Sequence, residues 1–170
     1  MKFSQYTEFK TEGGGFLNLK QGENKVRVVS EFEHFLSDYQ GRKNDRFMGY
    51  VIDRTDGQIK LLTIGKMIFG ELGEYSTSAE FGFTDVPPYD VVIKKTGEGK
   101  ETDYKVIPAR QNTELTAEEK KQVSELKPVS EVIDAMVAKT PDKYFKVGIK
   151  EEVGVDYDEK EPINPSDLPF

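Results

Sequence analysis

Basic and aromatic residues are interleaved along residues 25–66 of this 170-residue chain. Single-stranded nucleic acid offers spaced phosphates and exposed base faces, so a binder without sequence preference needs cations along a groove and flat side chains beside them. The stretch therefore predicts a site for unpaired nucleic acid. Its cations are Lys25, Arg27, Arg42, Lys43, Arg46, Arg54, Lys60 and Lys66, and its rings are Phe32, Phe35, Tyr39, Phe47 and Tyr50.

A regular strand over residues 46–54 would separate the two candidate rings, because successive side chains point to opposite faces. Arg46, Tyr50 and Arg54 would share one face, and Phe47 would lie on the other. Tyr50, flanked by two arginines, is the first choice for a stacked base. Lys94 and Lys105 form a second basic group with Lys95, Lys100 and Tyr104. Taken singly, each of these cations is also compatible with an ordinary solvated surface, and each phenylalanine with the core.

Few catalytic or metal-binding arrangements are open to this chain. It has no cysteine, and His34 is its one histidine, so thiolate zinc sites and cysteine nucleophiles are excluded. The run at 97–102 has the wrong glycine spacing for a phosphate-binding loop and is read as a hairpin turn. The acidic C-terminal stretch lacks the glycine and glutamate spacing of a calcium loop. We therefore expect no enzyme, no metal and no cofactor.

Charge divides the chain into two parts. Residues 151–170 contain seven acids and one lysine, which accounts for −6 of the formal net charge of −7. A nearly neutral body followed by a concentrated acidic end is typical of an interaction tail. Charge and prolines leave this end too little apolar surface to offset ordering entropy. We expect a domain over 1–150 and a disordered acidic tail over 151–170.

Five strands are expected from the patterns of apolar residues and turns. They are residues 25–31, 46–54, 58–65, 89–95 and 103–109, with a helix over 66–75 between the third and fourth. Residues 32–45 and 81–88 are read as loops, and Asp56 with Gly57 as a hairpin turn. Two further helices are expected, over 116–126 with a Thr116–Glu119 capping box and over 130–138 with Ser130 as cap.

This order predicts a mainly β protein, a five-stranded OB-fold barrel with a helix between strands 3 and 4 and C-terminal helices. Five-strand patterns also fit SH3-like barrels and other small β folds. No apolar run is long enough for a secretion signal or a membrane span, so we expect a cytoplasmic protein without a membrane partner.

Specific segments resemble the phage single-stranded-DNA-binding family. They are GENKVRVVSE at 22–31, VIDRTDGQIKLLTIG at 51–65 and YDVVIKKTGEGKETDYKVIPA at 89–109. The terminal Asp167, Leu168, Pro169 and Phe170 are similar to the acidic tip of bacterial single-stranded-DNA-binding proteins. The chain departs from relatives of the first family, because it lacks their Cys/His zinc site and their tryptophans.

The resemblance implies sequence-independent binding and protection of single-stranded DNA in replication, recombination or repair. It also implies that the four terminal residues recruit replication or recombination proteins, and self-association on DNA is compatible with it. Two alternatives stay open at this point. One is an OB or SH3-like adaptor that binds a protein partner, and the other is a single-stranded-RNA-binding protein, because stacking rings are indifferent to the sugar.

Overall fold

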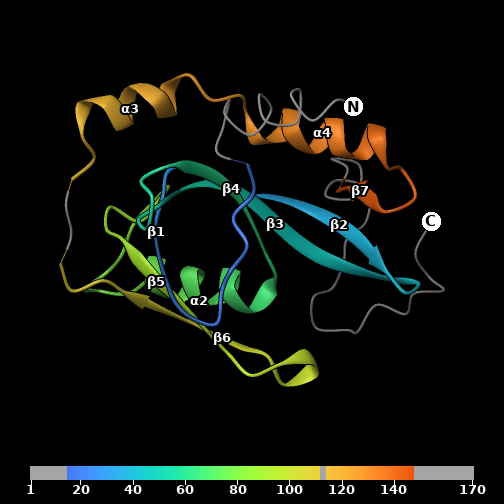
Figure 1. Ribbon diagram of the computed structural model, residues 1–170, viewed down its shortest axis with the longest axis horizontal. Helices are drawn as coiled ribbons and strands as arrows, with labels where there is room; N and C mark the ends of the chain where they lie inside the picture. The colour runs from blue at the N-terminus through green and yellow to red at the C-terminus, as the bar shows by residue number, and fades with distance from the viewer. Residues whose placement is uncertain (1–14, 112–113, 148–170) are drawn as a thin grey trace.

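The computed structural model describes residues 15–111 and 114–147. It contains a seven-stranded sheet whose strand pairs are antiparallel, together with three α-helices (Figure 1). In chain order the elements are β1 (Gly22–Val28), β2 (Glu33–Tyr39), β3 (Arg42–Asp53), β4 (Ile59–Ile64), α2 (Lys66–Ser76), β5 (Val91–Thr96), the 3₁₀ helix η1 (Gly99–Glu101), β6 (Asp103–Pro108), α3 (Ala117–Ser124), α4 (Val129–Lys139) and β7 (Tyr144–Lys146).

Strand β3 organises the sheet. The strand order is β6-β5-β1-β3-β2-β7, and β4 pairs with the remaining edge of β3. Since β4 covers that edge from Phe47 to Ile52, β1 and β2 must follow one another along the opposite edge. Between them the chain bulges, and the Tyr50 backbone N–H donates to the Ser30 hydroxyl at 2.7 Å instead of to a strand. Strands β1 and β2 therefore act as one long, interrupted strand.

The two faces of β3 build two separate hydrophobic clusters, as strict alternation requires. Val51 and the β4 residue Leu62, which pairs with Gly49, lie in an inner cluster with the α2 residues Ile68 and Leu72. The opposite face carries an outer cluster that is covered by α4. It consists of Phe35, Met48, Tyr50, Ile52 and Ile59 from the sheet, with Val129 and Ile133 from α4. The expected alternation over 46–54 is confirmed, and both faces of its second half are buried.

The sheet stays open between β4 and β6, because no pairing joins these strands within the described ranges. Residues 15–21 cross this region instead. The Leu17 N–H donates to the Leu61 carbonyl on β4 at 2.8 Å, and the Gln21 side chain donates to the Gly97 carbonyl beyond β5 at 2.6 Å. On β6, the Val106 N–H donates to the Glu71 carboxylate of α2 at 2.5 Å. A helical side chain thus occupies the position that a neighbouring strand would need.

The expected fold is confirmed in its coarse features only. The described residues form an open sheet of seven strands and not the expected barrel of five, and two elements differ from the expectation. The protein is mainly β, as expected. The expected helix between the third and fourth expected strands is α2, which lies between β4 and β5, and the C-terminal helices are present as α3 and α4. Residues 32–45, read as a loop, instead form β2 and the start of β3, joined at Gln40 and Gly41 with φ of 52° and 80°. Their mixed composition hid the strands because β2 has both partly buried and exposed residues without clean alternation. Strand β7 was not expected either.

The C-terminal helices begin where capping chemistry allows. Thr116 and Glu119 form the expected capping box, with the Glu119 N–H donating to the Thr116 hydroxyl at 3.1 Å and the Thr116 N–H donating to the Glu119 carboxylate at 2.9 Å. The expected Ser130 cap of the next helix is wrong, because α4 begins earlier with Pro128 in the capping position. Pro128 is favourable there, since proline costs nothing where no helical N–H bond is made.

Gly49 gives a direct test of this packing. A Cβ at Gly49 would lie 2.5 Å from Cε1 of Phe32, so Gly49→Ala should displace that ring and lower the free energy of unfolding by about 1–3 kcal/mol. Gly70→Ala is the matched control, because a Cβ at this exposed position in α2 meets nothing within 4 Å. Gly70→Ala should raise the free energy of unfolding by up to about 1 kcal/mol, because alanine favours the helix over glycine. Equal effects in chemical denaturation would contradict the packing.

Candidate nucleic-acid interface

The expected stacking position of Tyr50 is wrong. Tyr50 is 6% exposed and lies in the outer cluster beneath α4, so its ring has no open face for a base. Burial raises the pKa of its hydroxyl, and the nearby Glu131 carboxylate adds to this effect. The residue alternation was read correctly from the sequence, but nothing in the strand itself indicates that a later helix covers this face.

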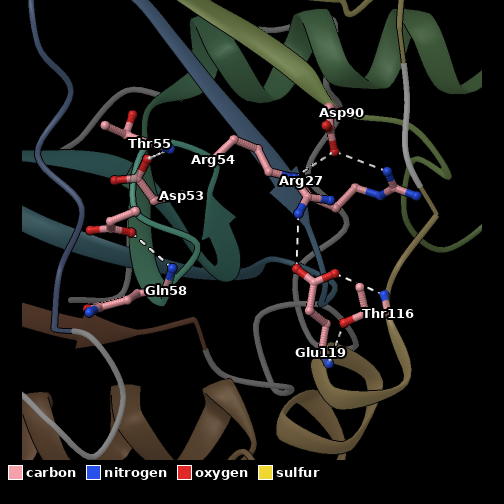
Figure 2. A network of polar contacts seen from close by, with 9 residues as sticks. Arg27, Asp53, Arg54, Thr55, Gln58, Asp90, Thr116 and Glu119 are labelled. Atoms are coloured by element: carbon pink, nitrogen blue, oxygen red, sulfur yellow. Dashed lines mark hydrogen bonds and ion pairs between the residues drawn. The ribbon is translucent and has the colours of Figure 1, made fainter.

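Arg27 and Arg54, expected to contact phosphates, are held in an ionic network (Figure 2). Arg27 is 6% exposed; its guanidinium lies 3.0 Å from the Asp90 carboxylate and donates to the Pro88 carbonyl at 3.0 Å. Arg54 reaches the same Asp90 oxygen at 3.2 Å and Glu119 of α3 at 3.0 Å. Their contribution is structural, because removing one partner of a buried ion pair leaves an uncompensated charge at a cost of roughly 3–5 kcal/mol.

Lys60 is likewise paired within the β3–β4 turn region. Its ammonium lies 2.8 Å from the Asp53 carboxylate and 2.6 Å from that of Asp56, and the side chain is 16% exposed. Burial opposes the charged form, yet the hydrogen bonds to Asp53 and Asp56 raise the pKa of Lys60. The expected groove of Arg27, Tyr50 and Lys60 therefore does not exist as an open surface.

A different ring surface lies on the inner face of the β2–β3 hairpin. Phe47 is stacked between two rings: Phe69 of α2 at 3.9 Å between centroids and 1° between planes, and His34 of β2 at 4.9 Å and 17°. Phe69 is 38% exposed and the His34 side chain 37% exposed, so the stack reaches solvent. Sequence reasoning missed Phe69, although its place on α2 beside the buried pair Ile68 and Leu72 marks it as a ring off the helix's core face.

Cations adjoin this ring stack. Lys66, three residues before Phe69 on α2, is 76% exposed and lies 2.6 Å from the Asp45 carboxylate, which also bonds His34 at 2.7 Å. Burial alone would raise the pKa of Asp45, but hydrogen bonds from Lys66 and His34 lower it. Further out on the same face of β3, the Lys43 ammonium lies 4.5 Å from the centre of the Phe145 ring. Phe47, Lys43 and Lys66 are thus the expected residues that the structure brings together.

The other expected cations lie elsewhere. Arg42 and Arg46 point to the opposite face of the hairpin, since Arg46 pairs across the strands with the buried Phe35. Lys25, Lys94 and Lys105 share the exposed outer face of β1, β5 and β6. Lys94 and Lys105 are directly opposite one another, and neither forms an ion pair with any described residue. Like charges so placed repel, which makes this face a second place for an anion.

Comparisons with known proteins add no relative. No protein-family model, no curated protein and no solved structure matches the chain. Among the described residues there is no helix long and apolar enough to cross a membrane, and no group of three or more side chains suited to holding a metal ion. The expected partner-binding residues Asp167, Leu168, Pro169 and Phe170, and the expected boundary at residue 150, lie outside the described residues.

Acid should loosen the attachment of α3 through Glu119. Hydrogen bonding from the Thr116 backbone, together with Arg54, lowers the pKa of Glu119 below its ordinary 4.5 in the folded protein. The stability this provides is complete above the unfolded pKa and is lost as pH falls through the folded pKa. In urea unfolding between about pH 6 and about pH 3, Glu119→Gln should therefore flatten the acid loss of stability.

The same substitution should cost about 1–2 kcal/mol at neutral pH, where the cap and the ion pair are both intact. Exposed Glu118→Gln on the same helical turn is the control and should reproduce the parent's pH profile. A Glu119→Gln profile parallel to that of Glu118→Gln would show that the network does not carry the acid sensitivity.

Proposed function

We propose that this protein binds single-stranded DNA without sequence preference, in replication, recombination or repair. The observation that carries the proposal is the solvent-exposed stack of His34, Phe47 and Phe69, with Lys43 and Lys66 on the same surface. Every base has a flat face, so exposed rings bind bases without reading sequence, while flanking ammonium groups attract phosphates. The resemblance of three sequence segments to phage single-stranded-DNA-binding proteins supports the same function.

The strand order also supports an OB-type architecture. Strands β1 and β2 together count as one interrupted first strand. The core then follows the order first strand, β3, β4, helix α2, β5 and β6. The first strand pairs with both β3 and β5. OB folds are partly open barrels that bind oligonucleotides on strands 2 and 3 and on the neighbouring loops. Here those strands correspond to β3 and β4. Since α4 covers their outer face, DNA would bind along the projecting β2–β3 hairpin and the adjoining end of α2.

The protein's overall charge is compatible with this site. The −7 formal charge is concentrated in residues 151–170, so the body is close to neutral. Binding would then depend on a few local cations and would weaken as salt rises. We also propose that the acidic end, through Asp167, Leu168, Pro169 and Phe170, recruits replication or recombination proteins.

Removing the exposed end of the ring stack tests the function. Phe69→Ala should weaken binding of fluorescent oligo-dT by roughly 5- to 150-fold, the loss expected for one stacked base. Phe16→Ala is the matched control, because Phe16 is a 50% exposed ring on the far part of the β4 edge. Fluorescence anisotropy should show oligo-dT bound in preference to duplex DNA. Equal binding of oligo-U would make RNA the alternative ligand, and no binding to any strand would favour a protein adaptor.

Charge-matched double variants separate the two cationic surfaces. Lys43→Gln with Lys66→Gln should reduce the slope of log affinity against log salt by about 1.4, the value for two lost phosphate contacts on a single strand. Lys94→Gln with Lys105→Gln removes the same charge from the outer face of β5 and β6. A reduced slope in the second variant alone would move the DNA to that face and reject the ring stack as its site.

A further inference from the structure

Phe69 also lines a pocket of about 390 Å³. This pocket lies between α2, the bulge that joins β1 to β2, and the loop before β5. Its walls include the rings of Phe32, Phe69 and Phe83 together with Leu72. The volume is within the range of roughly 300–1,000 Å³ typical of small-ligand sites.

The walls of this ring-lined pocket are held in place before anything binds. The Phe32 ring lies against the backbone of Gly49, in space that any side chain there would fill. The Phe83 N–H donates to the Ser76 carbonyl at 3.2 Å, and its ring packs edge-on to Tyr89 at 6.3 Å. Phe69 is held by its stack on Phe47. A preformed pocket loses little entropy on binding, because its side chains are already ordered.

The charges around the pocket determine which ligand fits. Glu31 and Asp85 are exposed and line the opening, and no lysine or arginine contributes to the lining. The faces of aromatic rings are also negative, so carboxylates and rings together attract cations. A phosphate or the chain's own acidic C-terminal end would be repelled. The opening therefore differs in sign from the lysine-flanked part of the ring stack.

We propose that this pocket binds an arginine side chain presented by a basic segment of a partner protein. A planar guanidinium stacks on aromatic faces and donates paired hydrogen bonds to carboxylates, which a lysine ammonium does less well. An apolar residue beside the arginine would cover Leu72 and the ring edges. The pocket and the ring stack share the Phe69 ring, but the arginine proposal is argued from Glu31, Asp85 and the pocket walls and does not rest on nucleic-acid binding.

The test is an NMR titration of the full-length, isotope-labelled protein with acetyl-Gly-Arg-Phe-amide. Saturable shifts should appear at the amides of Ser30, Glu31, Thr84 and Asp85. The same peptide with neutral citrulline in place of arginine should bind roughly 10- to 100-fold more weakly, because its hydrogen bonds are no longer charge-assisted. This arm uses the unaltered protein, so its result does not depend on whether a variant folds.

A matched pair of variants completes the test. Glu31→Gln with Asp85→Asn should weaken the arginine peptide by at least about tenfold, whereas Glu74→Gln with Glu80→Gln, which removes two exposed acids outside the pocket, should not. Equal affinities for the arginine and citrulline peptides would overturn the proposal. So would shifts at these amides caused by deoxycytidine monophosphate and not by the peptide, which would make the pocket a nucleotide site. Oligo-dT binding by the Glu31 and Asp85 double variant is measured in a separate experiment, and its result bears on the DNA proposal alone.

Discussion

Burial of β3 on both faces determines which part of the central strand can meet a ligand. From Met48 to Asp53 every residue of the strand is buried, with Val51 facing α2 and Tyr50 and Ile52 facing α4. A strand covered on both sides cannot present side chains to a ligand. Only the earlier part of β3, where the hairpin projects beyond both helices, has residues available to solvent (Figure 1).

The ionic network attaches α3 to the polar end of β3. Asp90 accepts from both Arg27 and Arg54, and Arg54 continues to Glu119, whose second oxygen caps its own helix. One carboxylate thus links β1, the end of β3 and the start of β5, and a second links them to α3. Mutual pairing offsets part of the cost of desolvating these groups, while Arg54 Nη2 is buried without a hydrogen-bond partner among the described residues.

Local patterns in the sequence predicted most elements of the core but not their layering. The strands around Gly57, the helix at 66–76 and the Thr116 capping box follow from turn, spacing and capping chemistry among near neighbours. Whether Tyr50 or Phe47 faces solvent depends on α4, which lies far away in sequence. The pairing of Arg27 with Asp90 spans 63 residues, so no local pattern of apolar and polar residues predicts it.

The contact of Glu71 with β6 also affects how copies of this protein behave together. The outer edge of a sheet has unpaired backbone groups that another chain can extend. On β6 the Val106 N–H already donates to the Glu71 carboxylate, and Pro108 at the end of the strand has no N–H. An incoming strand would have to displace a charged side chain and then lie beside it. The contact therefore disfavours strand-by-strand association of two copies through β6.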